Sequence, residues 1–288
     1  MDRNANGRDP MYEAIIIGGG PAGLQAALTL GRMHRRTLLL DSGEYRNATV
    51  PHAHNLLGND GTAPADLRGR GRDELAAYAT VEVRDATVSA VASDDNGVRV
   101  EIEGEVLHAE HLVLATGLSD DLPAIPGLGE HWGDRVANCP FCHGHEFAGR
   151  PIAVLNASPH AAMLESMLRP VASEVVVLDP AAVTRADGTA TGLRLTLEDG
   201  GTVEVAGAFV APVSRQRAPF AAQLGLELQE SGAVRVDPFG RTSVEGVFAA
   251  GDMAHADHFP GPMASLAGAI AAGQLAAVAI VQRLAARG

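Results

Sequence analysis

Lysine is absent from this sequence, so all 22 basic residues are arginine, against 35 acidic residues and a formal net charge of −13. Without a lysine amine, Schiff-base and pyridoxal chemistry are excluded. The acidic balance also argues against a nucleic-acid partner, because such proteins need a basic face. We expect none.

Segments that would direct the chain out of the cell or into a membrane are also scarce. Residues 1–17 lack the basic region, apolar core and cleavage site of a signal peptide, so we expect a cytoplasmic protein in a reducing compartment. The one long uncharged stretch, residues 262–281, is mostly Ala and Gly and contains Ser265 and Gln274. It predicts a closely packed C-terminal helix rather than a membrane span.

A glycine-rich turn near the N-terminus carries the first motif. Residues 12–17 are apolar and lead through GGGPAG into a segment with apolar residues at helical spacing, which predicts strand, turn and helix. The turn fits GxGxxG at Gly18, Gly20 and Gly23, and a second short strand ends at Asp41. In a nucleotide-binding turn the first glycine permits the tight bend, the second admits the pyrophosphate and the third allows close helix packing, while the acid binds ribose hydroxyls.

The rest of the chain repeats this organisation. Residues 80–91 and 98–102 predict a meander, residues 111–118 a buried strand, and 121–129 a Pro/Gly-rich domain crossing. A second strand–helix–strand unit spans 151–178, with a hairpin at 190–210 and a strand within 233–252 that ends in Gly-Asp. We therefore expect an α/β fold of two Rossmann-like nucleotide-binding domains, the second inserted into the first. The expected boundaries are 1–118 and 236–288 for the first domain and 119–235 for the second.

The two cysteines, Cys139 and Cys142, form a CxxC pair within NCPFCHGHE. A zinc site would need a distant second pair of ligands, and covalent haem, although the CxxCH pattern matches, normally accompanies export. A redox-active dithiol is the interpretation we favour, since thiols at this spacing can close a small disulfide ring. His143, and with less support His145, is placed where a proton carrier is needed.

Taken in order, GGGPAG, LVLATGL, the CxxC and GVFAAGD resemble the low-molecular-weight thioredoxin reductases over essentially the whole chain. The resemblance implies an FAD domain built from both chain ends, an inserted NADPH-type domain that carries the dithiol, and a homodimer. The residues that it places at the FAD are Gly18, Gly20, Pro21, Ala22, Gly23, Asp41, Ser42, Val83, Thr116, Gly117, Gly251, Asp252, Met263 and Ala264.

The second nucleotide turn departs from the reductase pattern. Residues 155–162 contain no glycine, and the strand after them leads to Asp179 rather than to an Arg-rich run for the 2′-phosphate. Side chains at these positions block the backbone approach that a pyrophosphate requires, and Asp179 would repel the phosphate. We therefore expect that NADPH is not bound.

Two further features, the CPFCHG sequence and residues 45–78, resemble the FAD-dependent dithiol oxidases that form disulfides in natural products such as gliotoxin, holomycin and romidepsin. The resemblance places Arg46, Asn47 and His54 at the flavin. It implies oxidation of a small-molecule or peptide dithiol, with electrons passing through CxxC and FAD to O₂ to give H₂O₂, and Cys139 attacked first. Two alternatives are a disulfide reductase fed by NADPH or by a protein donor such as ferredoxin, and a flavin-bound redox sensor without turnover.

Overall fold

The computed structural model describes residues 12–94, 97–259, 261–262 and 264–286. It divides into two compact units. Unit 1 consists of Met1–Arg46, Ala65–Ser119 and Arg215–Gly288, and unit 2 of Asn47–Pro64 and Asp120–Ser214. Unit 2 therefore contains residues 47–64, which the expected boundaries place in the first domain. Residues 1–11, on which the expectation about a signal peptide depends, and Met263 lie outside the described residues.

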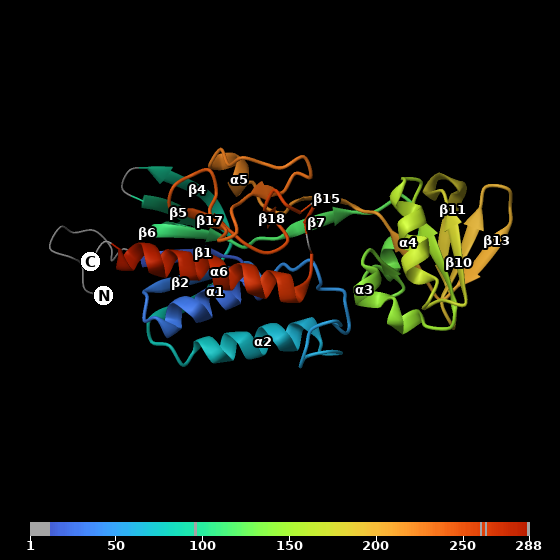
Figure 1. Cartoon of the computed structure of the whole chain (residues 1–288), viewed down its shortest axis with the longest axis horizontal. Coiled ribbons are helices and arrows are strands. Elements are labelled where there is room, and N and C mark those ends of the chain that lie inside the picture. Colours follow the sequence, from blue (N-terminus) through green and yellow to red (C-terminus); the bar gives the residue numbers. More distant parts are fainter. Residues whose placement is uncertain (1–11, 95–96, 260, 263, 287–288) are drawn as a thin grey trace. The chain divides into compact units, whose positions relative to one another are not determined.

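Unit 1 is built on a seven-stranded sheet with the order β3-β2-β1-β6-β5-β4, in which β17 also pairs with β6 (Figure 1). Strands β3, β2, β1, β6 and β17 are parallel, and β6, β5 and β4 form an antiparallel meander. The strands are β1 (Tyr12–Ile17), β2 (Thr37–Asp41), β3 (Val81–Asp85), β4 (Val88–Asp94), β5 (Gly97–Ile102), β6 (Glu105–Leu114) and β17 (Val247–Ala249).

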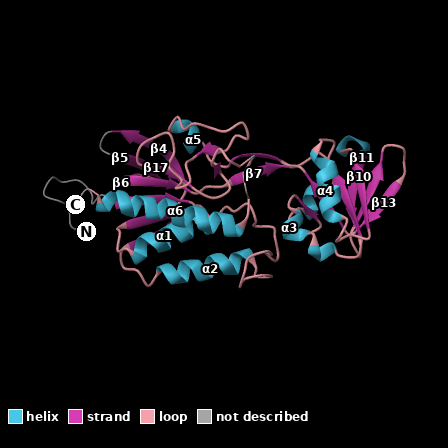
Figure 2. Cartoon of the chain, viewed as in Figure 1, coloured by secondary structure: helices cyan, strands magenta, loops and turns pink. Residues whose placement is uncertain are grey.

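Helices α1 and α6 lie side by side on one face of this sheet (Figure 2). Ser265 caps the longer one, since its hydroxyl accepts a hydrogen bond from the Gly268 backbone N–H at 3.0 Å. The helices are α1 (Pro21–Arg32), α2 (Pro64–Leu75), α5 (Phe220–Gln223) and α6 (Leu266–Ala285), and two short strands, β16 (Val234–Arg235) and β18 (Ala254–His255), pair with each other.

Close packing of the C-terminal helix is confirmed where α6 crosses α1. A Cβ at Gly273 would overlap the carbonyl oxygen of Ala22, so only glycine allows this approach. Burial is partial, however, because only 33% of the most apolar 18-residue window of α6 is buried. Within the part of the chain that the structure describes, α6 alone is long and apolar enough to cross a membrane by length and composition.

Unit 2 has a four-stranded parallel sheet, β10-β9-β14-β8, and a three-stranded antiparallel sheet, β11-β12-β13. Strands β7 and β15, at which the chain crosses between the units, pair with each other. The strands are β7 (Leu118–Asp121), β8 (Val136–Ala137), β9 (Pro151–Leu155), β10 (Glu174–Leu178), β11 (Val183–Gly188), β12 (Leu193–Leu197), β13 (Thr202–Val205), β14 (Gly207–Val210) and β15 (Val213–Gln216). The helices are η1 (Leu128–His131), α3 (Pro140–His143), η2 (His145–Phe147), α4 (His160–Leu168) and η3 (Pro180–Ala182).

The expected fold class, two Rossmann-like domains of which the second is inserted in the first, is confirmed. Two expected strands have other bounds than the sequence suggests. The strand expected at 111–118 is β6, which begins earlier, at Glu105, and ends at Leu114, before Gly117 takes a left-handed φ of 69°. The strand expected within 233–252 is interrupted and forms only the short strands β16 and β17. Between them the Asp237 carboxylate accepts hydrogen bonds from the Phe239 and Arg241 backbone N–H groups and forms a turn.

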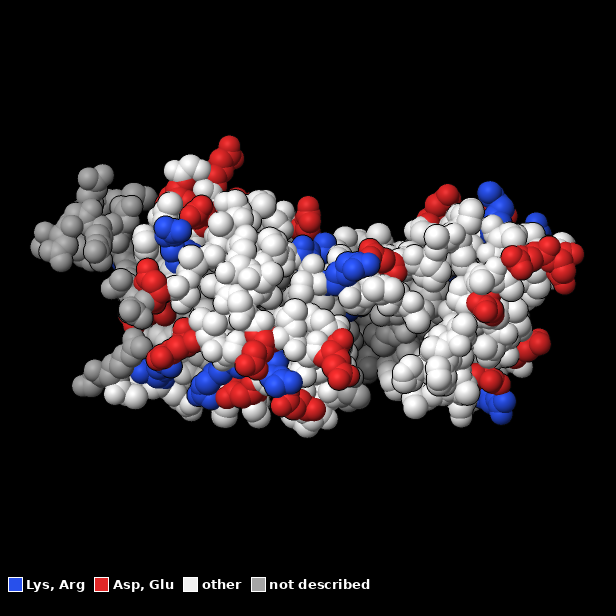
Figure 3. Space-filling view, turned by 90° about the horizontal axis from the view of Figure 1, so that it is seen from above, with Lys and Arg blue, Asp and Glu red and all other residues white. Residues whose placement is uncertain are grey.

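Acidic and basic side chains are interspersed on the face of the molecule that Figure 3 shows.

Substitution of Gly273 tests the α1–α6 contact. Gly273→Ala is expected to lower the free energy of unfolding by about 1–3 kcal/mol, because the new methyl group must push the helices apart. Gly69→Ala is the matched control, since a Cβ at this α2 position meets no atom within 4 Å. The control should be neutral or stabilise by up to about 1 kcal/mol. Denaturant titration of both variants measures this, and equal stabilities would contradict the packing argument.

Candidate active site

The glycine turn between β1 and α1 has the geometry of a phosphate cradle. A Cβ at Gly18 would overlap the Ala115 carbonyl oxygen, and one at Gly23 the Gly18 carbonyl oxygen, whereas one at Gly20 would meet nothing within 4 Å. Gly20 is the N-cap of α1 and no side chain caps the helix. The first backbone N–H groups of α1 therefore have no side-chain cap, and the space beside the Gly20 Cα is open, as anion binding requires.

The carboxyl ends of four parallel strands meet at this turn. The Gly18 N–H donates to the Leu40 carbonyl at 2.8 Å, the Ala115 N–H to Ile17 at 2.8 Å and the Ala250 N–H to Leu114 at 2.9 Å. Ligands of open α/β sheets bind at this edge. The structure therefore brings together the segments that hold most of the expected cofactor residues, namely Gly18, Gly20, Pro21, Ala22, Gly23, Asp41, Thr116, Gly117, Gly251 and Asp252.

Asp41 is buried at the end of β2, with side chains around it that the sequence analysis missed. Its Oδ2 accepts hydrogen bonds from the Tyr45 hydroxyl at 2.5 Å and from Arg72 at 3.0 Å, and its Oδ1 from the Gly43 N–H at 3.2 Å. Burial and the hydrogen bond to Asp41 raise the pKa of Tyr45. A carboxylate offers about four acceptor positions, so the three bonds leave one for a ribose hydroxyl.

Two further contacts in unit 1 involve expected site residues. Arg46 forms an ion pair with Asp252 at 2.9 Å, with both side chains mostly buried. The Thr116 hydroxyl donates to the Met253 sulfur at 3.3 Å. Three other expected cofactor residues belong to this unit. Val83, in the middle of β3, and Ala264, just before α6, are half-buried, and Ser42, directly after β2, is exposed.

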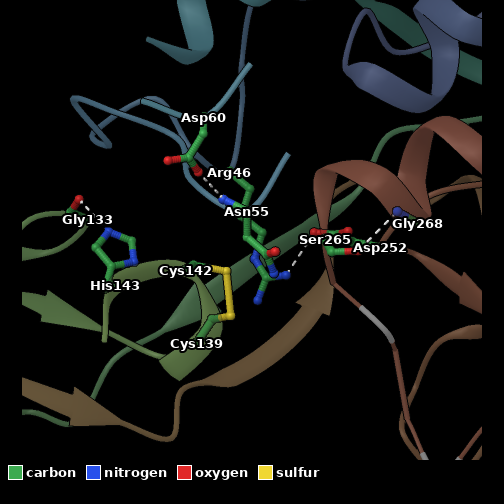
Figure 4. The surroundings of a disulfide bond; sticks show 10 residues. All are labelled: Arg46, Asn55, Asp60, Gly133, Cys139, Cys142, His143, Asp252, Ser265 and Gly268. Carbon is green, nitrogen blue, oxygen red and sulfur yellow. Dashed lines mark hydrogen bonds and ion pairs between the residues drawn. A yellow bond between two sulfur atoms is a disulfide. The ribbon is translucent and has the colours of Figure 1, made fainter. Parts of the chain in front are cut away.

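In unit 2 the two cysteines form a disulfide across the turn that leads from β8 into α3 (Figure 4). Cys139 is the N-cap of this one-turn helix, and its carbonyl accepts hydrogen bonds from the Cys142 and His143 N–H groups, each at 3.2 Å. The bond between Cys139 and Cys142 is the pairing that the redox-dithiol interpretation requires. Among the described residues no group of three or more His, Cys, Asp or Glu could hold a metal ion.

His143 directly follows the disulfide and is held by the backbone. Its Nε2 lies 3.2 Å from the Gly133 carbonyl oxygen. Its Nδ1 is buried and has no hydrogen-bond partner within the described residues. Figure 4 shows Nδ1 on the side of the ring that faces the Cys139–Cys142 disulfide. An unprotonated ring nitrogen without a partner has a free lone pair.

Asn47 and His54, which the resemblance places at the flavin, belong to unit 2. The His54 ring lies between two carboxylates, with Nδ1 3.5 Å from Asp60 and Nε2 3.4 Å from Glu146. A hydrogen bond from the Asn55 N–H, with a smaller contribution from His54, lowers the pKa of Asp60. His145 is exposed and also contributes to this lowering.

The second nucleotide turn, between β9 and α4, provides its own hydrogen-bond acceptors. The Asn156 Oδ1 accepts from the Ser158 N–H at 2.8 Å, and the Ser158 hydroxyl accepts from the His160 N–H at 3.3 Å. In a nucleotide site these donors face the pyrophosphate. Two N–H groups of the turn before α4, those of Ser158 and His160, are therefore occupied by side-chain acceptors, whereas no side chain caps α1.

The fold and these sites define a flavoprotein-type disulfide oxidoreductase, and comparison with known proteins agrees. The family model described as "Pyridine nucleotide-disulphide oxidoreductase" matches residues 12–182 and 171–280. The chain therefore belongs to this family of enzymes, whose flavoproteins use FAD.

Individual relatives support the thioredoxin reductase-like resemblance, which is confirmed. The chain is 35% identical over 280 residues to the thioredoxin reductase tcpT of Claviceps purpurea, covering 84% of this chain and 86% of that protein. It is 32% identical to the thioredoxin reductase aclD of Aspergillus oryzae, covering 96% and 97%. The crystal structure of HlmI superposes with a TM-score of 0.87 at 31% identity, covering 96% of this chain and 94% of that chain.

Gly20 gives a direct test of the cofactor site. Gly20→Leu is expected to lower bound FAD at least tenfold, because the side chain would occupy the space beside the α1 N-terminus where the phosphates bind. Absorbance of the purified protein reports flavin content. Gly69→Leu, the same change at an open helix position, should keep full occupancy. Full FAD binding by Gly20→Leu would contradict the assignment.

Proposed function

We propose that this protein is an FAD-dependent dithiol oxidase that forms a disulfide in a small-molecule or peptide dithiol and passes the electrons to O₂. The observation that carries the proposal is the turn before α4, where Asn156 and Ser158 occupy the N–H groups that would bind the NADPH pyrophosphate. Without that donor, the proposed source of the reducing equivalents that reach the Cys139–Cys142 pair is the dithiol substrate.

The residues of unit 1 fit FAD. The open space at Gly20, the side-chain-free N-terminus of α1 and the remaining acceptor position on Asp41 match the phosphates and ribose of a dinucleotide. When bound, FAD supplies the two-electron transfer from the enzyme dithiol to O₂.

The dithiol half of the reaction follows from thiol–disulfide exchange. A substrate thiolate attacks Cys139, the Cys139–Cys142 bond breaks, and Cys142 leaves as a thiolate. The second substrate thiolate then attacks the substrate sulfur of the mixed disulfide and releases Cys139. The substrate has lost two electrons and two protons, which the enzyme dithiol holds. When the Cys139–Cys142 disulfide forms again, the same two electrons and two protons pass to O₂ and give H₂O₂.

His143 is the base that we propose for this exchange. Its Nδ1 is buried, lacks a partner among the described residues and faces the disulfide, so it can take the proton of a substrate thiol and later return it to the Cys142 thiolate (Figure 4). The acidic net charge of −13 disfavours strongly anionic dithiols, because the substrate would approach against long-range repulsion. Neutral or cationic dithiols are therefore the proposed substrates, for a homodimeric enzyme.

A disulfide reductase is the second candidate, because tcpT and aclD are both named thioredoxin reductases. The two candidates differ in the source of electrons. A reductase accepts them from NADPH or a protein donor, whereas the oxidase accepts them from a dithiol.

Anaerobic mixing separates these candidates. NADPH and NADH at millimolar concentration are expected to leave the flavin oxidised, because the turn before α4 lacks glycine and the Ser158 and His160 N–H groups are bonded to side chains. A dithiol added to the same sample should bleach the flavin absorbance, which shows that the protein is competent. Rapid bleaching by NADPH would support the reductase instead.

The pH dependence of His143→Ala tests the proposed base. A thiol with a pKa of about 8.5 is only a few per cent ionised at pH 7, so the base matters most near neutral pH. His143→Ala should therefore slow dithiol-dependent O₂ uptake by about 10²-fold or more at pH 7 and much less at pH 9. An oxygen electrode measures both, with His160→Ala, an exposed histidine of the same unit, as control.

Two results would count against this account. No O₂ uptake with any dithiol, although FAD is bound, would reject the oxidase. A defect of His143→Ala that is equal at pH 7 and pH 9 would leave the oxidase in place and reject the histidine as its base.

A further inference from the structure

The contact between His143 and Gly133 determines which ring nitrogen can act as a base. A backbone carbonyl only accepts hydrogen bonds, so the contact of 3.2 Å requires the hydrogen on Nε2. In the neutral ring the lone pair is then on Nδ1. This is the buried atom that has no partner in the described part of the chain.

Gly133 is itself held in a conformation that favours glycine. Its φ is 89°, a left-handed value, and its N–H donates to the Val136 carbonyl at 2.9 Å. A Cβ at this position would overlap the Thr49 hydroxyl and lie against the Thr49 backbone. The direction of the Gly133 carbonyl is therefore fixed from two sides, by β8 and by Thr49.

The segment that carries Thr49 has its own anchors within unit 2. The Ala53 N–H donates to the Thr62 carbonyl at 2.9 Å, which closes the segment into a loop. His54 contacts Glu146, three residues after His143, at 3.4 Å. The segment Asn47–Pro64 thus contacts the chain on both sides of the disulfide, at Gly133 before it and at Glu146 after it.

We propose that Gly133, supported by Thr49, is a positioning residue that fixes the tautomer of His143 with the lone pair on Nδ1. The inference rests on the proposed function in one respect only, namely that Nδ1 is the atom that accepts the substrate proton. The tautomer itself is a property of the resting protein, and it can be measured without turnover.

Long-range ¹H–¹⁵N NMR of protein labelled with ¹⁵N-histidine tests the tautomer, with the His143 signals assigned by their loss in His143→Gln. At a pH high enough for the His143 ring to be neutral, the wild-type protein should show a protonated Nε2 and an unprotonated Nδ1. Gly133→Ala should give a mixture of the two tautomers. The control Gly129→Ala should match the wild type, since a Cβ there meets only an ordinary contact at 3.9 Å. A protonated Nδ1 in the wild type overturns the proposal even if Gly133→Ala fails to fold.

A double-mutant cycle on dithiol-dependent O₂ uptake separates positioning from damage to the fold. Gly133→Ala alone should lower kcat/KM about tenfold or more, and should cause no further loss in a His143→Ala background. Losses that multiply in the double variant would overturn the proposal. If no oxidase activity exists, the NMR result still decides on the tautomer, so failure of the proposed function and failure of this inference are distinguishable.

Discussion

Close approach of backbone segments at the glycine turn is the constraint on which unit 1 depends. Gly18 lies against the Ala115 carbonyl and Gly23 against the Gly18 carbonyl, and neither contact leaves room for a Cβ. These approaches align the carboxyl ends of β1, β2, β6 and β17 at one edge. Asp41, Thr116 and Asp252 reach the same region from separate parts of the sequence because of that alignment. The α1–α6 contact at Gly273 repeats the same principle in the helix layer.

The two nucleotide-binding turns show how the same topology supports different chemistry. In each unit a parallel strand leads through a turn into a helix, yet the backbone donors are exposed at Gly20 and occupied at Ser158. The difference comes from a few side chains, chiefly Asn156, whose amide oxygen forms a local turn. Unit 2 thus keeps the sheet that leads into the CxxC turn, while the Ser158 and His160 N–H groups of its nucleotide turn bond to side chains of the same turn.

Local patterns made much of the fold and part of the site predictable from the sequence. Strand β1, the glycine turn and the CxxC pair are contiguous motifs, and their elements form as expected. Contacts between distant residues were not predictable. Arg72 reaches Asp41 from 31 positions away, on a helix whose two glycines and many charges hide its periodicity. Gly133 lies ten residues before His143, and neither spacing nor composition connects the two. Thr49 comes from a segment that the sequence assigned to the other domain.

The small size of the ring closed by Cys139 and Cys142 has a consequence for folding. A disulfide stabilises a protein mainly by restricting the unfolded chain, and the effect grows with the number of residues enclosed. Only two residues lie between these cysteines, and the turn is also held by backbone hydrogen bonds from Cys142 and His143 to Cys139. The unfolded chain therefore loses little conformational entropy when the bond closes. Reduction of this disulfide should therefore cost unit 2 less stability than reduction of a disulfide that encloses a long loop.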